Sequence, residues 1–320
     1  MLAALMATNP NPSAPPWLAA FLGGERAALA RPVTEVENDG PFAAAVLAAA
    51  RAAPARAMVV GITGAPGAGK STLVGAYVGE LRSRGLTVAV LAVDPSSPLT
   101  GGALLGDRIR MSRHAGDAGV FVRSLASRGH LGGLARNAAL VADVMASSGR
   151  DVVVVETVGV GQSEIEIAEL ADVRIVVWAP GAGDDVQAAK AGILEIADLI
   201  VVNKADLPQA AATEAALRSA ASYAAAPPRV LTTAALSGRG VPALADAAAA
   251  LAAGHDVQSG ERARQRRRRR LLGEAERFAR MRLAALDGAV ADRLLARIDT
   301  GELDLDAAAQ ALLQAALAGD

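Results

Sequence analysis

Seven short runs of apolar or β-branched residues punctuate the middle of the chain, and each is followed by a segment able to form a helix. Continuous apolar strands that alternate with helices are typical of a parallel sheet covered on both faces. We therefore expect an α/β domain with a mostly parallel sheet over residues 56–258. The predicted strands are Met58–Ile62, Val88–Val93, Val120–Val122, Val152–Val155, Ile175–Trp178, Leu199–Val202 and Val230–Leu231.

Both flanks of this domain have helical rather than strand periodicity. Residues 1–55 begin with a Pro- and Asn-rich tail and continue with apolar residues at helical spacing, interrupted by a turn cluster at residues 38–41. Residues 259–320 are charged and again helical in pattern. A helix that cannot bury its apolar face alone packs on a domain or a second subunit. We expect an N-terminal helical extension and a C-terminal helical arm.

Composition narrows the classes of protein that the chain can belong to. Of its 320 residues, 52% are hydrophobic and 2% aromatic, so the core must consist mainly of Ala, Val, Leu and Ile. The net charge of -1 gives no reason to expect nucleic acid or an anionic membrane as a partner. Cysteine is absent, which excludes disulfides and thiolate metal sites. Since no signal, transit or membrane-spanning pattern is present, we expect a cytoplasmic protein.

The first chemical signal follows the first predicted strand directly. Residues 64–71 fit the pattern GxxxxGK[ST] in the strand, loop and helix context that a phosphate-binding loop requires. Its backbone N–H groups and the following helix N-terminus favour phosphate oxygens. Lys70 is expected to reach the β and γ phosphates and Ser71 to ligate Mg²⁺. The predicted nucleotide-binding residues are Gly64, Ala65, Pro66, Gly67, Ala68, Gly69, Lys70, Ser71 and Thr72.

The second signal selects the base. Residues 203–206 follow the penultimate predicted strand and match the NKxD element of GTPases. The Asp206 carboxylate can accept both guanine N1–H and the guanine amino group, a pair of donors that adenine lacks. Asn203 is expected to brace the loop and the guanine edge, and the Lys204 stem to lie against the base. The last guanine loop is expected to use backbone N–H groups of Ala234, Ala235 and Leu236. GTP and GDP are the predicted ligands.

Acidic residues stand at the ends of two predicted strands. Asp94 and Glu156 are therefore expected near Mg²⁺, directly or through water, because ligands collect at the carboxyl ends of parallel strands. The alternative for either residue is a helix cap. Polar, Gly-rich stretches follow both strands and are expected to respond to the γ phosphate, with Gln162 as the candidate for orienting the attacking water. A third such stretch contains Asp184, Asp185 and Lys190.

Several of these motifs together resemble one family. In chain order the segments are GITGAPGAGKST, VDPSSPLTGGALLGDRIRM, SRGHLGGLARN, ETVGVGQSE, PGAGDDVQAAKAGI and VNKAD. They resemble the methylmalonyl-CoA mutase-associated GTPases of the MeaB/MMAA type, also called ArgK-like, over roughly residues 22–312. Glu156 stands where most GTPases have the Asp of DxxG, as it does in that family. Ala234 departs from the family pattern, in which Ser is usual.

The resemblance implies more than the individual motifs do. It implies a SIMIBI-class P-loop domain, with a C-terminal arm that forms a homodimer. It also implies a GTPase chaperone of an adenosylcobalamin-dependent acyl-CoA mutase, which gates cofactor loading and protects or reactivates the mutase. By matching motifs, Asp94, Asp107 and Glu156 would serve Mg²⁺ and catalysis together with Lys70. Residues 184–190 would form a switch that responds to the partner.

Other functions stay open at the level of sequence. A P-loop domain could also transfer the γ phosphate to a small molecule, as a kinase does. A metallochaperone GTPase is disfavoured because Cys is absent and the three His residues have no metal-ligand spacing. The basic run at residues 266–270 opens an amphipathic helix that also contains Glu274 and Glu276, so we interpret it as a solvated or dimer-contacting face rather than an RNA site.

Overall fold

The structure is a computed structural model, in which two compact units, residues 1–256 and 257–320, are described separately. Within these units it describes residues 15–22, 29–53, 57–94, 114, 116–126, 133–157, 171–181, 197–224, 226–256, 268, 271–272, 275, 278–286 and 288–318.

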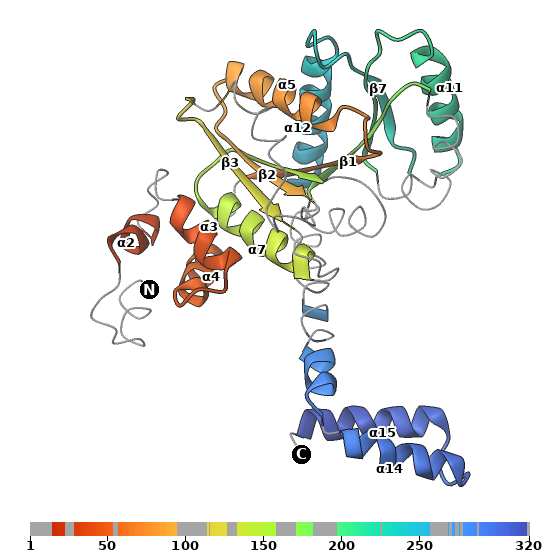
Figure 1. Ribbon diagram of the computed structural model, residues 1–320. Helices are drawn as coiled ribbons and strands as arrows, with labels where there is room; N and C mark the ends of the chain where they lie inside the picture. The colour runs from red at the N-terminus through yellow and green to blue at the C-terminus, as the bar shows by residue number, and fades with distance from the viewer. Residues whose placement is uncertain are drawn as a thin grey trace. The chain divides into compact units, whose positions relative to one another are not determined.

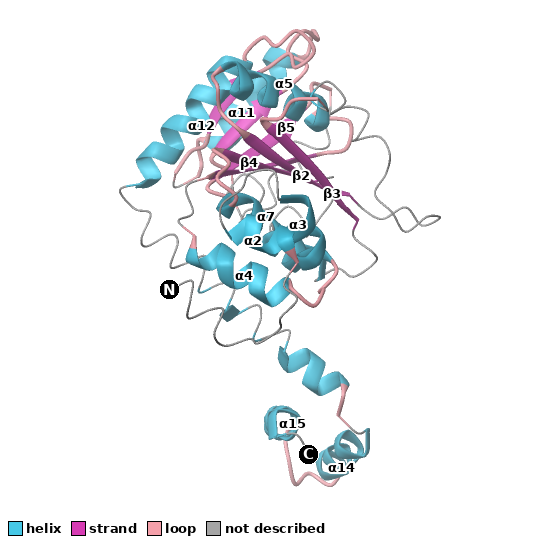
Figure 2. Ribbon diagram, turned by 90° about the vertical axis from the view of Figure 1, so that its left-hand side faces the viewer, coloured by secondary structure: helices cyan, strands magenta, loops and turns pink. Residues whose placement is uncertain are grey.

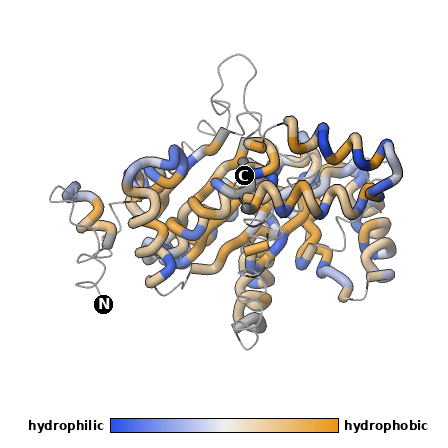
Figure 3. Tube along the Cα trace, turned by 90° about the horizontal axis from the view of Figure 1, so that it is seen from below, coloured by the Kyte–Doolittle hydropathy of each residue, from blue (hydrophilic) through white to orange (hydrophobic). Residues whose placement is uncertain are grey.

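A seven-stranded sheet forms the centre of the first unit (Figure 1). Its strand order is β3-β2-β4-β1-β5-β6-β7, and every neighbouring pair is parallel, as the sequence predicts. The strands are mostly hydrophobic along their length (Figure 3), as expected for a sheet covered on both faces. The strands are β1 Met58–Gly64, β2 Val88–Asp94, β3 Val120–Ala126, β4 Val152–Thr157, β5 Val173–Trp178, β6 Leu199–Val202 and β7 Arg229–Thr232.

Helices cover the two faces of the sheet (Figure 2). On one face, α5 (Lys70–Ser83) and α12 (Val241–Asp256) pack on inward-facing valines and isoleucines of the central strands. On the other face, α7 (Gly133–Ser147) covers β1, β2 and β4, while α11 (Ala210–Ala221) covers β5, β6 and β7. Because strand side chains alternate between faces, each strand contributes to both cores.

Three helices of the described residues precede β1 and continue the core on the α7 side. They are α2 (Pro16–Leu22), α3 (Ala30–Glu37) and α4 (Ala43–Ala52), and their apolar residues belong to the same buried cluster as α7. The Trp17 ring meets the Phe42 ring edge to face, with centroids 5.8 Å apart. At the end of α3, Glu37 pairs with Arg123 of β3. The helices before β1 are thus packed onto the sheet domain rather than attached loosely.

Among the described residues of the second unit, α14 (Gly288–Asp299) and α15 (Leu305–Ala318) pack against each other. The turn between them is closed by an ion pair between Arg297 and Glu302 at 2.7 Å. No residue of α14 is buried, and Leu295, Leu305 and Leu317 are exposed. In this unit the described helices therefore present apolar side chains that they do not cover themselves. None of the described helices of the chain has both the length and the apolar composition needed to cross a membrane.

Candidate functional site

The predicted phosphate-binding loop joins β1 to α5 at the edge where the strands end, which we call the carboxyl edge. Two of its glycines are required because other parts of the chain lie too close to leave room for a side chain. A Cβ on Gly64, whose φ is 142°, would lie 2.1 Å from the carbonyl oxygen of Val177. A Cβ on Gly69, whose φ is 85°, would lie 2.6 Å from Nδ2 of Asn203. Since both positions are left-handed and crowded, only glycine fits the loop between β5 and the turn after β6.

Lys70 is the first residue of α5, and its side chain lies back along the loop. Its Nζ donates to the carbonyl oxygens of Gly64 at 2.7 Å and Ala65 at 2.9 Å. The residue is buried, so the ammonium group is held at the loop by backbone rather than by solvent. A fixed cation at the start of a helix is suited to a phosphate chain.

Ser71 and Glu156 meet on the α5 face of the sheet. The Ser71 hydroxyl donates to Oε1 of Glu156 at 2.6 Å, and both residues are buried. Glu156 occupies the β4 position that pairs with Ile62 of β1 and Ala92 of β2. The longer side chain of Glu, compared with Asp, spans from β4 to the first turn of α5.

A hydroxyl and a carboxylate are the hard oxygen donors that Mg²⁺ prefers, together with water and substrate phosphates. Within the described residues, no group of three or more acidic or His side chains forms a metal site by itself. Ser71 and Glu156 thus fit a metal that takes one or two ligands from the protein. Asp94 is the last residue of β2, beside β4, and its side chain lies outside the described part.

Asn203 connects the two predicted nucleotide motifs. Its Nδ2 donates to the carbonyl oxygens of Ala68 at 3.0 Å and Gly69 at 3.3 Å. Its Oδ1 accepts the Thr233 hydroxyl at 3.1 Å and the Ala235 N–H at 3.2 Å. These four bonds engage both ends of the side-chain amide. Asn203 is therefore a brace between the phosphate loop and the last loop, and its predicted contact with the guanine edge stays a prediction.

The turn after β6 displays the predicted base-reading residue. Lys204 adopts a left-handed φ of 54°, and the Ala205 N–H donates to the Thr233 carbonyl at 2.9 Å. The turn closes with the Leu207 N–H donating to the Lys204 carbonyl at 3.0 Å. The side chains of Lys204 and Asp206 are exposed at the carboxyl edge. A carboxylate in this position is accessible to a ligand.

The last loop differs in detail from the expectation that its N–H groups face guanine. The Ala234 N–H donates to the Arg239 carbonyl at 2.9 Å, and the Ala235 N–H donates to Asn203. Both alanines are buried, whereas Leu236 is 84% exposed. The physical reasons are the antiparallel bridge between residues 234 and 239 and the brace at Asn203, because they already use two of the three N–H groups that the sequence assigns to the base. The predicted contact of the Leu236 N–H with guanine stays a prediction.

The structure thus brings the phosphate loop, Glu156, Asn203 and the last loop together from distant parts of the chain. Several predicted site residues lie outside the described part of the chain. These are Asp107, Gln162, Asp184, Asp185 and Lys190.

Sequence reasoning missed two hydroxyl residues at this edge. Thr63 and Thr157 are the residues next to Gly64 and Glu156, and their Oγ1 atoms are 3.1 Å apart and buried. The signal that could have found them is a threonine shortly after the apolar run of each strand. An apolar side chain would fill the same space, so a hydroxyl there indicates a hydrogen bond.

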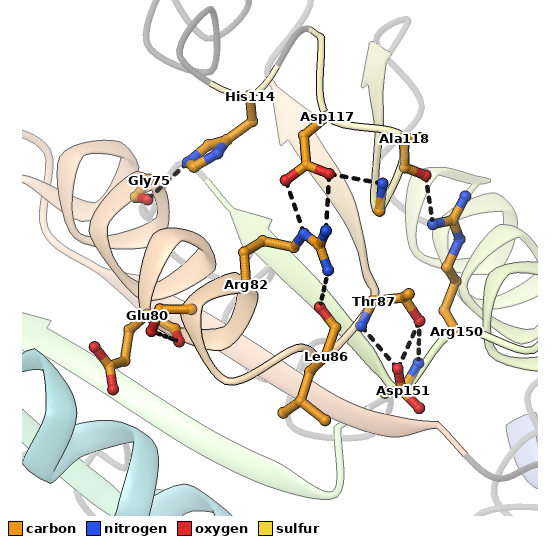
Figure 4. Close-up of polar contacts among 12 residues, drawn as sticks. Gly75, Glu80, Arg82, Leu86, Thr87, His114, Asp117, Ala118, Arg150 and Asp151 are labelled. Carbon is orange, nitrogen blue, oxygen red and sulfur yellow. Dashed lines mark hydrogen bonds and ion pairs between the residues drawn. The ribbon is translucent and has the colours of Figure 1, made fainter.

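The opposite edge, where the strands begin, carries charged clamps, and we call it the amino edge (Figure 4). Asp117 accepts Nε and Nη2 of Arg82 at 2.8 and 2.9 Å, and the Gly119 N–H at 2.8 Å. The Arg82 hydrogen bond, followed by the Gly119 N–H, lowers the pKa of the Asp117 carboxyl. Arg82 also donates to the Leu86 carbonyl at 2.7 Å. The end of α5 is thereby tied to the turns before β2 and β3.

Further aspartates hold the other strand starts in the same way. Asp151 accepts the N–H and hydroxyl of Thr87 at 2.7 and 2.6 Å. Asp172 accepts the Val59 N–H at 2.9 Å. Asp198 accepts the N–H of Arg174 at 2.8 Å and its guanidinium at 2.8 and 2.7 Å. These contacts satisfy backbone groups that precede or open the strands, and we assign them a structural role.

Comparison with known proteins agrees with the geometry of the carboxyl edge. The model of the family described as Methylmalonyl Co-A mutase-associated GTPase MeaB matches residues 29–287. A protein of Pyrococcus abyssi that is named as a GTPase is 54% identical over 190 residues, which are 59% of this chain and 59% of that protein. The chain therefore spans less than two thirds of the length of this relative.

Two longer matches extend the likeness. A protein of Caulobacter vibrioides, also named as a GTPase, is 43% identical over 240 residues, covering 70% of this chain and 72% of the relative. A solved structure described as an LAO/AO transport system kinase has a TM-score of 0.72 at 30% identity, covering 93% of this chain and 95% of that one. The likeness to this solved structure thus extends over nearly the whole chain.

Proposed function

The chain belongs to the family of methylmalonyl-CoA mutase-associated GTPases, and from this premise we propose that it hydrolyses GTP as a chaperone of an adenosylcobalamin-dependent acyl-CoA mutase. The observation that carries the nucleotide part is the brace at Asn203. Two of its hydrogen bonds join the loop that precedes Lys70 to the turn that ends in Asp206, and the other two join this turn to the last loop. A phosphate-binding end and a base-binding end therefore belong to one site.

Guanine is selected by Asp206 in this proposal. The exposed carboxylate accepts guanine N1–H and the amino group, and adenine offers no such pair of donors. Asn203 contributes indirectly, because it fixes the turn on which Asp206 stands.

The residues of the phosphate loop perform the electrostatic part of catalysis. Backbone N–H groups of the loop and of the start of α5 hold the phosphates, and the Lys70 ammonium neutralises charge that develops on the transferred phosphoryl group. Buried surroundings keep Lys70 oriented before substrate binds. Ser71 and Glu156 would hold Mg²⁺, with Asp94 and Asp107 as further ligands proposed from the matching motifs. The metal, when bound, would supply positive charge at the β and γ phosphates.

The partner and the oligomeric state are proposed from the family and from the second unit. We propose that Asp184, Asp185 and Lys190 respond to the mutase, and that Gln162 orients water. Exposed Leu295, Leu305 and Leu317 support a homodimer formed through the C-terminal arm, because a second copy would cover them.

The nucleotide proposal is tested by Asp206→Asn. Asparagine presents one donor and one acceptor, which suits xanthine better than guanine. One hydrogen bond to guanine loses its acceptor and the other loses its charge assistance, so GTP affinity is expected to fall by roughly 100-fold or more while xanthosine triphosphate gains affinity. The measurement is equilibrium binding of both nucleotides. Asp151→Asn at the amino edge is the matched control and should leave both affinities unchanged. Equal binding of GTP by Asp206→Asn and the parent protein would refute the assignment.

The partner proposal needs its own experiment. A tagged acyl-CoA mutase is tested for co-purification with this protein, and adenosylcobalamin transfer is then measured with GTP and with a non-hydrolysable analogue. Transfer that depends on the nucleotide supports gating, and transfer indifferent to it contradicts gating. Because one structural relative is described as a kinase, γ-labelled GTP is also followed. Label in inorganic phosphate supports hydrolysis, whereas label in a small molecule would establish the kinase alternative.

A further inference from the structure

We propose that Thr63 and Thr157 form a positioning pair that sets the Glu156 carboxylate against Ser71. This inference rests on the proposed nucleotide site and adds two residues to it. The Thr157 hydroxyl donates to Oγ1 of Thr63 at 3.1 Å, and the residues are only 2% and 4% exposed. Neither residue is placed to touch nucleotide in our proposal, since each acts through a neighbour.

The pair lies where the backbone ladder between β1 and β4 stops. The last paired residues of these strands are Ile62 and Glu156. Thr63 and Thr157 occupy the next positions, so a side-chain hydrogen bond continues the cross-strand link by one step. Cross-strand Thr pairs of this kind stabilise the alignment of strands. The hydroxyl pair therefore adds one cross-strand contact to the alignment of β4 with β1, next to Glu156.

Glu156 and Thr157 hold the end of β4 from opposite faces of the sheet. Successive strand residues point to opposite faces. On the α5 face, Glu156 accepts the Ser71 hydroxyl at 2.6 Å. On the α7 face, Thr157 reaches Thr63. If the second contact is removed, β4 can rotate or shift about the first, and the carboxylate moves with it.

Thr63 also connects the pair to the phosphate loop. It directly precedes Gly64, whose carbonyl accepts the Lys70 ammonium at 2.7 Å. The hydrogen bond between Thr63 and Thr157 thus links the phosphate loop, through Gly64, to the end of β4 that carries Glu156. Misplacement of catalytic groups by about 1 Å can cost up to about 100-fold in rate, which makes such a link consequential.

Thr157→Val tests the pair, because valine keeps the shape of threonine and removes only the hydroxyl. We expect GTP turnover at saturating nucleotide to fall about 10-fold. The Mg²⁺ concentration that half-saturates the slowing of labelled GDP release is expected to rise by a similar factor. Metal-free GDP affinity and the thermal midpoint should stay close to those of the parent protein. Thr157→Ser keeps the hydroxyl and should restore turnover and the Mg²⁺ midpoint.

Two controls separate positioning from simple loss of a buried hydroxyl. Ser148→Ala removes a buried hydroxyl that donates to the Met145 carbonyl at 2.6 Å, and it should leave the Mg²⁺ midpoint unchanged. Thr63→Val combined with Thr157→Val should be no worse than Thr157→Val alone, because both remove the same bond.

The outcomes distinguish this inference from the function on which it rests. An unchanged Mg²⁺ midpoint in Thr157→Val overturns the pair, and so does failure of Thr157→Ser to restore it. Absence of GTP hydrolysis in the parent protein would contradict the proposed function instead. The GDP-release measurement would still test the pair in that case, since it needs only nucleotide and Mg²⁺.

Discussion

At the amino edge of the sheet, four aspartates each accept a backbone N–H beside a strand start. At the carboxyl edge, by contrast, side chains from different elements bond to one another and to loop carbonyls. The amino-edge acceptors are Asp117, Asp151, Asp172 and Asp198. Two of them also pair with an arginine. At the carboxyl edge, Lys70 bonds to backbone carbonyls and Glu156 to a hydroxyl.

The difference shows how one sheet separates stability from ligand binding. Charged pairs at the amino edge satisfy each other and the backbone, so they need no ligand. The carboxyl edge gathers a cation, a carboxylate and glycine loops, which are the groups that a phosphate chain and a metal use. We therefore expect substitutions at the carboxyl edge to change nucleotide chemistry, and those at the amino edge to change the free energy of unfolding.

The largest effect is expected from Lys70→Ala. The variant removes the cation that the loop holds, and turnover of GTP should fall by roughly 100- to 1,000-fold, the range seen when one charge-stabilising donor is lost. The thermal midpoint should change little, because the alanine still suits the start of α5. Single-turnover hydrolysis and a thermal melt measure the two quantities. A large loss of stability with normal turnover would contradict the expectation that substitutions at the carboxyl edge change nucleotide chemistry rather than stability.

A smaller effect is expected from Asp198→Asn, which should change the free energy of unfolding and not the turnover of GTP. This carboxylate accepts three hydrogen bonds from Arg174, and Asn can replace only part of them. Since the Arg174 side chain is about one third exposed, the free energy of unfolding should fall by only about 1–2 kcal/mol. Urea unfolding measures the change, and turnover of GTP should be retained.

The matched control for this substitution is Asp246→Asn. Asp246 also pairs with an arginine, Arg84, but its side chain is 68% exposed. Its replacement should cost less than about 0.5 kcal/mol. Equal losses in the two variants would mean that the strand-start contacts of Asp198 add nothing.

The two edges also differ in how far sequence could predict them. The phosphate loop and the NKxD turn are contiguous motifs, and apolar runs predicted all seven strands. Most strands extend past the predicted ends, as β1 does to Gly64, because polar and small residues close them. The strand order depends on which crossovers the chain takes, which no local pattern encodes.

Long-range contacts explain what sequence could not supply. Asn203 bonds to a loop 134 and 135 residues earlier, and the use of its whole amide is visible only in three dimensions. The Thr63 and Thr157 hydroxyls are 94 residues apart. At the amino edge, Arg82 and Asp117 resemble ordinary surface charges until the fold brings them together.

The smallest effect is expected from Asp117→Asn, and it tests whether the amino edge contributes stability through charge. The bond from Arg82, with that from Gly119 N–H, holds the pKa of Asp117 below its unfolded value of about 3.9. A carboxyl whose pKa is lowered by folding contributes stability above its unfolded pKa, and this contribution is lost as the pH falls through its folded pKa. The parent protein should therefore be slightly more stable than the variant at pH 7.

That difference should shrink as the solution is acidified below about pH 4, while turnover of GTP at pH 7 should be equal in the two proteins. Urea unfolding of both proteins at about five pH values between pH 3 and pH 7 measures the trend. A constant difference across that range would show that Asp117 acts through hydrogen-bond geometry alone, since an amide oxygen accepts at every pH. A difference that grows toward acid would contradict the lowered pKa, and with it the view of the amino edge as a set of charge-dependent clamps.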